Sequence, residues 1–215
     1  MSDYVIALPV PPNALRRKVG DAILNLVLQV PASAEHEMTQ PLIRARAIGR
    51  SAARQASLMA ASLALPPGVL GWLTVLPELV AVLRLQAQMV SDIAAAYGKT
   101  ASLNREHMLY CLFRHLAAQL FRDVVVRVGE RVMIRRASLT LLQSLAQALG
   151  IRVTQGIVGK GAARLVPLIG AVGVGAYAYF DTTQVARTAI ELFSSDVVDG
   201  MTQQQSSDAL PPSAP

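Results

Sequence analysis

The fold of this chain depends on residues 58–98, which read LMAASLALPPGVLGWLTVLPELVAVLRLQAQMVSDIAAAYG. Between Arg54 and Arg84 the sequence carries a single charged residue, Glu78, and an apolar run of that length raises the question of a membrane span. The run also contains three prolines and two glycines, which a straight helix tolerates poorly in its interior. We therefore expect two helices that meet at the Pro-Pro-Gly corner of residues 66–68.

The second of these helices is predicted over about residues 74–97. At about 100° per residue its apolar side chains share one broad arc, and Arg84, Gln88, Ser91 and Asp92 lie opposite that arc. This pattern is typical of an amphipathic helix with a wide apolar face. Arg84, Gln88 and Asp92 are spaced four apart, so that neighbours can support one another. Gly98 is expected to end the helix in a left-handed conformation.

The composition of the 215-residue chain is basic and unusually apolar. Hydrophobic residues make up 53 % and charged residues 16 %, whereas soluble domains carry about 25 % charged residues. The net charge is +6, and because the chain has three lysines among its 20 basic residues, arginine dominates. Nucleic-acid-binding domains combine basic clusters with exposed aromatic residues, and aromatic residues are 5 % here. An anionic membrane surface is therefore the expected partner, and nucleic acid is not.

The location of the protein is predicted from its termini and its cysteine content. Cys111 is the only cysteine, so no disulfide framework suggests secretion. The first residues lack a basic segment before their short apolar run, and a signal peptide is rejected on that ground. We expect a cytoplasmic protein at the inner face of the cell membrane.

The remaining segments predict a single all-α domain. We expect a leader over residues 1–12, a helical domain over 13–195 and a disordered tail over 196–215. The fold class is a compact bundle of about six to eight helices with Pro/Gly-broken apolar helices at its centre. Further helices are predicted over residues 13–30 with Asn13 as N-cap, 41–65, 104–121 with Asn104 or Ser102 as cap, 136–149 closed by Gly150, and 182–193.

Two stretches between these helices are less regular. Residues 123–134 alternate valines, but a single strand without a partner is unstable, so a helix is preferred there. Residues 151–162 are expected to form a junction or a weak helix. An apolar stretch follows over residues 165–180, and its 16 residues span only about 24 Å as a helix, short of a roughly 30 Å bilayer core. Its Ala171 and Gly175 form a small-xxx-small pair, which lets another backbone approach closely, and the Pro-Pro-Gly corner region is the expected partner.

A basic stripe and two apolar segments are the candidate membrane-contacting features. Arg46, Arg50 and Arg54 recur at every fourth position with Arg44 beside them, and we expect these four side chains to face anionic headgroups. Beyond Arg54 the same predicted helix becomes apolar, so it is expected to change from a basic stripe to a buried or membrane-dipping end. Glu78 is either a polar handle in a lipid or partner pocket or a salt-bridge partner of Arg84 or Arg164. The residues expected to touch the membrane or lipid are Leu65, Val69, Leu70, Trp72, Leu73, Leu168 and Ile169.

Two stretches of the sequence contain residue types found in metal sites and phosphate-binding loops. His107, Cys111 and His115 are spaced four apart on one predicted helix, but the first and third are separated by about 12 Å and cannot surround one ion. Gly159-Lys160 lacks the Ser or Thr that completes a phosphate-binding loop. We therefore expect no catalytic residues, no metal and no cofactor, and a structural role for the His/Cys face.

The two apolar segments also resemble a known family. Residues 65–99, LPPGVLGWLTVLPELVAVLRLQAQMVSDIAAAYGK, and residues 165–193, LVPLIGAVGVGAYAYFDTTQVARTAIELF, are similar to the central and C-terminal motifs of the EcsC family. The family resemblance implies an all-helical bacterial protein at the inner face of the membrane, related to an uncharacterised domain attached to some GTPases. The founding member is encoded with an ABC transporter, and the family brings no catalytic residues.

Together these features predict a non-enzymatic, peripheral, membrane-associated protein, an accessory to a transport or envelope process. The alternative is a soluble, oligomeric helical module that binds a protein or lipid ligand, or a second copy of itself. An integral protein with a membrane hairpin and a metal or redox enzyme are the remaining alternatives. The three prolines and the short second segment argue against the hairpin.

Overall fold

The computed structural model describes residues 12–63, 70–121, 125–128, 131–134, 137–160 and 167–195. The expected all-α bundle is confirmed, with six α-helices in these residues. The predicted leader, the Pro-Pro-Gly corner and the predicted tail lie outside them. The helices are α1 Pro12–Leu28, α2 Pro41–Leu63, α3 Leu70–Ala96, α4 Arg105–Ala117, α5 Leu139–Lys160 and α6 Pro167–Ser194, and two short 3-10 helices cover Thr100–Ser102 and Ala118–Phe121.

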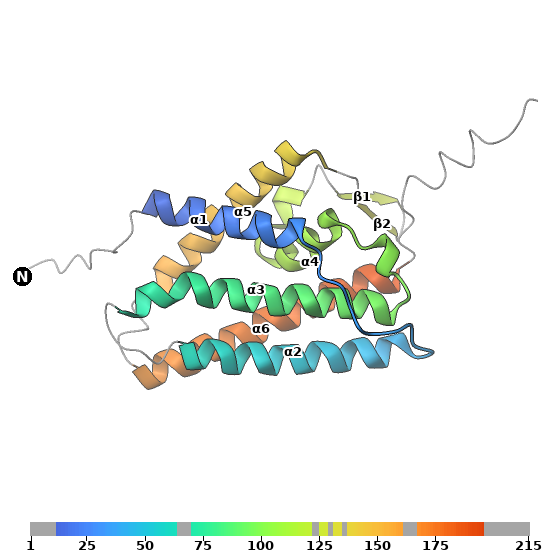
Figure 1. Ribbon diagram of the computed structural model, residues 1–215, viewed down its shortest axis with the longest axis horizontal. Coiled ribbons are helices and arrows are strands. Elements are labelled where there is room, and N and C mark those ends of the chain that lie inside the picture. The colour runs from blue at the N-terminus through green and yellow to red at the C-terminus, as the bar shows by residue number, and fades with distance from the viewer. Residues whose placement is uncertain are drawn as a thin grey trace, which may run out of the picture.

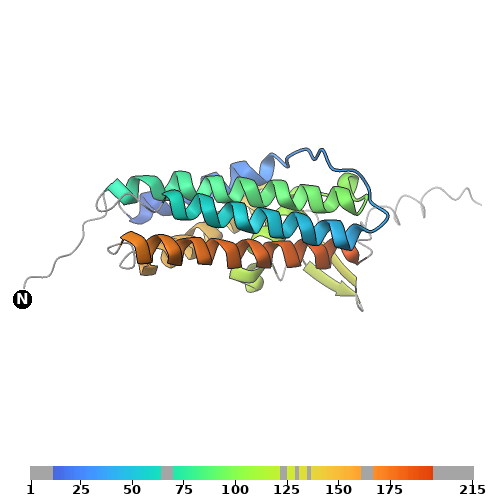
Figure 2. The same ribbon diagram turned by 90° about the horizontal axis from the view of Figure 1, so that it is seen from below.

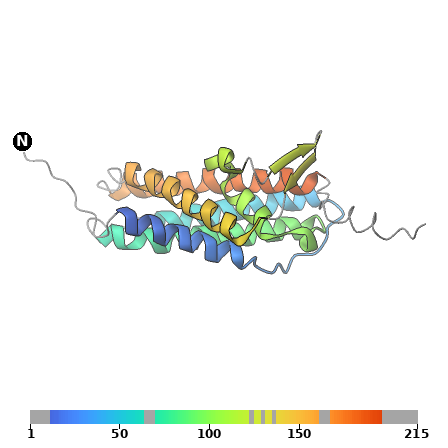
Figure 3. The ribbon, with the colours of Figure 1, turned by 90° about the horizontal axis from the view of Figure 1, so that it is seen from above.

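The helices form two layers. Helices α2, α3 and α6 run side by side along the long axis (Figures 1 and 2). The C-terminal end of α2 and the N-terminal ends of α3 and α6 lie at the same end of the bundle (Figures 1 and 2). Helices α1, α4 and α5 cover the other side (Figure 3), with α1 packed on α5 and α4 packed on α6.

Helix α3 contributes the predicted apolar arc to the core. Val90 and Ile93 are fully buried, and Gly98 ends the helix with φ of +67° as expected. Ser91, which was predicted to lie opposite the apolar arc, is also buried, so that part of the prediction was wrong. The helix begins at Leu70, four residues before the predicted start, and Pro77 lies inside it at the cost of one backbone hydrogen bond. Helix α3 is thus the central helix of the bundle, in contact with α1, α2, α4 and α6.

One segment of α3 is long and apolar enough to cross a membrane by length and composition. It covers Leu79–Ala96, and 56 % of it is buried within the protein. No other helix in the described residues passes this test. A core helix packed on both sides has the same composition as a membrane span, so this segment does not distinguish between the two.

Helices α2 and α6 pack unusually closely, because small residues meet along their seam. They are antiparallel: Gly49 faces Ala186, and Gly175 faces Ser57 and Ala61. A Cβ atom added at Gly175 would lie 3.0 Å from the Ser57 carbonyl oxygen. The predicted close approach at Gly175 is confirmed, but among the described residues the partner backbone is that of α2 and not the expected Pro-Pro-Gly corner.

The prediction of a helix over residues 123–134 was wrong. Strands β1 Val125–Val128 and β2 Arg131–Ile134 pair antiparallel, with Val125 opposite Ile134 and Val128 opposite Arg131. The register leaves two residues between the strands, the commonest hairpin connection. The alternating valines did indicate a strand. Its partner is the second strand, which follows immediately in the sequence.

The predicted end of the helix over residues 136–149 and the predicted cap at Asn13 were also wrong. Helix α5 continues through Gly150 to Lys160, because Gly150 serves the crossing of α1 and α5 and not a helix end. A Cβ atom there would lie 2.8 Å from the Arg16 carbonyl oxygen. The apolar stretch and the amphipathic stretch near the C-terminus form one continuous helix, α6. Helix α1 begins at Pro12, one residue before the predicted cap Asn13.

Candidate functional site

The candidate site is the outer face of the α2–α6 pair, which we call the α2–α6 face. We define it by Arg46, Arg50, Arg54, Leu58, Val172, Tyr179, Phe180 and Arg187, all of which are exposed. The antiparallel seam fixes their relative heights, since Gly49 is level with Ala186 and Ser57 is level with Gly175. Arg187 therefore lies beside Arg46 and Arg50, and Phe180 lies near the height of Arg54 and Leu58.

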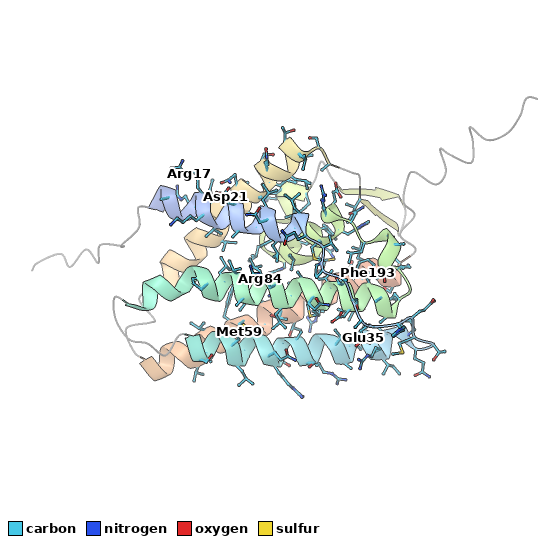
Figure 4. The ribbon with its side chains drawn as sticks, in the orientation of Figure 1. Arg17, Asp21, Glu35, Met59, Arg84 and Phe193 are labelled. Carbon is cyan, nitrogen blue, oxygen red and sulfur yellow. The ribbon has the colours of Figure 1, made fainter. Side chains whose placement is uncertain are left out.

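The face has a basic half and an apolar half. Figure 4 shows Glu35 near the N-terminal end of α2 and Met59 toward the opposite end. Arg46 and Arg50 lie toward the first end, and Leu58 lies toward the second, about 18 Å from Arg46 along the helix axis. The helix thus changes from charged to apolar along its length, as the sequence predicts.

In the basic half, the arginines lack acidic partners. Arg46, Arg50, Arg54 and Arg187 make no ion pair with any residue that the structure describes. The first two and Arg187 line a groove of about 430 Å³ between α2 and α6. Surface guanidinium groups without a carboxylate partner are available to an anionic ligand.

Arg44 behaves differently from the other predicted headgroup-facing arginines. Its guanidinium donates hydrogen bonds from Nε and Nη2 to the two carboxylate oxygens of Glu35. The hydrogen bond from Arg44 lowers the pKa of Glu35. The structure therefore places Arg44 in a surface ion pair, separate from the unpaired arginines.

In the apolar half, large side chains face outward. Leu58 is 73 % exposed, Val172 is 72 % exposed and Phe180 is 61 % exposed, with Tyr179 close to Phe180 in sequence. Sequence reasoning missed these residues. A signal was present, because Leu58 continues the four-residue spacing of Arg46, Arg50 and Arg54. Exposed apolar groups gathered beside basic ones are typical of interaction surfaces.

Most residues predicted to touch a membrane belong to helix ends that the fold brings together. Leu70, Trp72 and Leu73 start α3, and Leu168 and Ile169 start α6. These two helix ends lie at the same end of the bundle as the C-terminal end of α2 (Figures 1 and 2). The side chains of all five residues, and Leu65 and Val69 altogether, lie outside the described part of the chain.

Glu78 lies in α3 immediately after Pro77. Its side chain is also outside the described part. Both interpretations of this carboxylate, as a polar handle and as a salt-bridge partner, therefore stay predictions.

A polar cluster inside the bundle was not anticipated from the sequence. Asp181 of α6 accepts hydrogen bonds from Gln86 Nε2 of α3 at 2.8 Å and lies 2.7 Å from His115 Nε2 of α4. Gln86 Nε2 also donates to Thr182 Oγ1 at 3.0 Å. Gln86 and Thr182 are buried, so these bonds satisfy polar groups that would otherwise be costly in the core. The cluster ties together three helices.

The three residues of the predicted His/Cys face have separate structural roles. His107 completes a capping box with Asn104 at the start of α4, and His115 binds Asp181. Cys111 is fully buried, and this burial raises the pKa of its thiol, so the sulfur stays protonated. Among the described residues, no three His, Cys, Asp or Glu side chains are grouped to hold a metal ion.

Comparison with known protein families shows which family the chain belongs to. The model of the EcsC protein family matches residues 9–195. The chain belongs to the EcsC protein family. The matched range of this EcsC protein contains all six α-helices and the hairpin, so the α2–α6 face lies within the family domain. No curated protein and no solved structure matches the chain.

Proposed function

We propose that this EcsC protein is a non-enzymatic, peripheral protein that binds an anionic bilayer through the α2–α6 face. The observation that carries the proposal is that Arg50 and Arg54, which have no acidic partner among the described residues, line one surface hollow with the exposed Leu58. Val172 and Phe180 add exposed apolar surface on α6. Basic residues attract anionic lipid and apolar residues enter the acyl boundary, and stable attachment to a bilayer requires two such signals. The α2–α6 face carries both.

The expected contributions of the two halves are comparable. Each arginine near an anionic surface contributes about 1 kcal/mol at physiological salt. An apolar side chain such as that of Phe180 contributes about 1.5–3 kcal/mol when it is fully buried. Interfacial helices enter a bilayer by about 5–10 Å, so the apolar half would enter first and the arginines would meet the headgroups.

The cellular setting follows from the family resemblance and the composition. The net charge of +6 favours the cytoplasmic leaflet, whose lipids are anionic. We propose that the protein acts at the inner face of the cell membrane as an accessory to a transport or envelope process.

Vesicle co-sedimentation tests the proposal. The wild-type protein is expected to pellet with vesicles that contain phosphatidylglycerol and to remain in solution with pure phosphatidylcholine, and raised salt should weaken binding. The variant R46Q/R50Q/R54Q/R187Q should bind at least about tenfold more weakly. Binding that ignores both anionic lipid and salt would contradict the electrostatic part of the proposal.

A matched control separates the position of the charges from their number. The variant R17Q/R84Q/R105Q/R152Q removes the same number of exposed charges from α1, α3, α4 and α5. It should retain clearly more binding than the α2–α6 variant. Equal losses in the two variants would mean that net charge alone governs binding.

A soluble binding module is the second candidate. The observation that favours it is the same exposed Leu58, Val172 and Phe180, because such a patch can also be covered by a protein partner or a second copy. Light scattering without detergent distinguishes the two. A monodisperse dimer that L58S/F180S converts to a monomer, without vesicle binding, would favour the module.

A further inference from the structure

The arginines of the basic half line a groove between α2 and α6. Nonspecific attraction to an anionic surface would not require such a groove. Its floor is formed where Gly49 of α2 meets Ala186 of α6, and a Cβ atom on Gly49 would lie only 2.8 Å from the Ala186 Cβ. This close approach places the neighbouring side chains on two facing walls. Arg46 and Arg50 line one wall and Arg187 lines the other.

The remaining lining residues leave the positive charge uncompensated. Glu191 is the acidic residue of the groove, and Arg114 binds both of its oxygens at 2.6 and 3.5 Å. Thr183 donates its hydroxyl proton to the Tyr179 carbonyl oxygen at 2.8 Å. The groove therefore presents three guanidinium groups whose N–H groups are donors only, and its one carboxylate is already neutralised.

The size of the groove and its charge indicate the chemistry of a ligand. Its volume of about 430 Å³ falls within the roughly 300–1,000 Å³ of small-ligand sites. Guanidinium groups match the oxygens of phosphate in bidentate fashion. A phosphate monoester carries about −1.5 to −2 charges at pH 7 and would balance three guanidinium groups better than a singly charged diester.

We propose that the groove formed by Arg46, Arg50 and Arg187 is a discrete binding site for a phosphate monoester. The same chemistry occurs in a lipid headgroup such as that of phosphatidic acid and in a soluble phosphate ester. The lipid form of this proposal rests on the proposed membrane function, because it names the headgroup class that the α2–α6 face selects. The apolar residues Ala186 and Ile190 in the lining would contact the carbon part of the ligand.

The test uses a variant that keeps the net charge but replaces the planar guanidinium groups, each of which can contact two phosphate oxygens at once. R46K/R50K/R187K has the wild-type net charge but cannot form bidentate contacts. R17K/R105K/R152K is the matched control on α1, α4 and α5. Each protein is measured against vesicles that contain phosphatidic acid or phosphatidylglycerol at equal surface charge. Binding of soluble glycerol 3-phosphate is measured by calorimetry.

The expected result is tighter binding to phosphatidic acid than to phosphatidylglycerol, reduced about tenfold or more in R46K/R50K/R187K and kept in the control. Saturable binding of glycerol 3-phosphate that only R46K/R50K/R187K loses, without vesicle binding, would support the groove as a site for a soluble ester and overturn the membrane function. Equal binding of both anionic vesicles by all three proteins, with no binding of glycerol 3-phosphate, would overturn the groove site and leave the membrane function standing. Absence of all binding would overturn both.

Discussion

The first half of α6 reverses the usual distribution of side-chain sizes. Its inner face, toward α2, carries Gly175 and Ala178, which are buried, whereas Val172 and Phe180 on its outer face are mostly exposed. Protein interiors usually hold the large apolar residues. In the first half of α6 the small residues are inside, because close approach of the α2 and α6 backbones leaves no room for larger ones. In the second half, Leu192 and Phe193 are buried in the usual way.

The inner face of α6 therefore contributes to stability, and the outer face is available for binding. Close packing of small residues gains dispersion contacts along the seam, so the inner face holds α6 in the bundle. The large side chains on the outer face make few such contacts and stay available to a membrane or a partner. Substitutions on the two faces should therefore affect different measurements.

The largest expected effect is on the inner face. Gly175→Leu would place a side chain against the Ser57 carbonyl oxygen, which lies 3.0 Å from the position of a Cβ atom. Overpacking of this kind costs about 1–3 kcal/mol or more, so the midpoint of thermal unfolding should shift down by roughly 2–12 °C. Gly173→Leu is the control, since a Cβ there has no neighbour within 4 Å. Equal shifts in the two variants would contradict the distinction between the faces.

The next largest effect is expected for the polar cluster that joins α3, α4 and α6 inside the bundle. Asp181→Ala removes one of the two acceptors of Gln86 Nε2 and the partner of His115, and loss of such bonds to a carboxylate costs about 1–3 kcal/mol. Urea unfolding measures the loss. Thr183→Ala, whose hydroxyl bonds only to its own helix, should change stability by less than about 0.5 kcal/mol. A loss in Thr183→Ala as large as that in Asp181→Ala would mean that the cluster is not what stabilises this region.

On the outer face, a double substitution should affect binding and leave folding intact. V172S/F180S removes two exposed apolar side chains, so the free energy of unfolding should change by less than about 0.5 kcal/mol per site. Affinity for anionic vesicles should fall about tenfold or more, because the apolar contribution to bilayer contact is lost. A clear loss of stability would show that these side chains support the fold.

The smallest effect concerns the paired arginine at the edge of the face. Glu35→Gln removes the partner of Arg44 and adds a free guanidinium group to the basic half, so vesicle affinity should rise by less than about tenfold. Because Arg44 lowers the pKa of Glu35 in the folded state, the ion pair stabilises the wild type above the ordinary pKa of 4.5. This contribution disappears as the pH falls through the lowered value.

Unfolding measured across this pH range checks the prediction. The difference between wild type and Glu35→Gln should be present near neutral pH and vanish in acid. A difference that is constant with pH would exclude the ion pair as its cause.

The successes and failures of sequence reasoning have separate physical causes. The apolar arc of α3, the cap at Asn104 and the left-handed Gly98 were all predicted, because each depends on residues within a few positions. The hairpin was missed because a strand is stable only with a partner, and the partner was not considered. Gly150 was misassigned because a helix-ending glycine and a glycine at a helix crossing look alike in sequence.

The sequence by itself determined the helical class, the positions of most helices and the change along α2 from a basic to an apolar half. These properties follow from local periodicity and composition. The tertiary structure alone decided that Arg187 faces Arg46 and Arg50 across a groove and that Asp181 meets His115 and Gln86. Both results depend on the antiparallel register of α6, because packing between residues more than 60 positions apart leaves no local pattern in the chain.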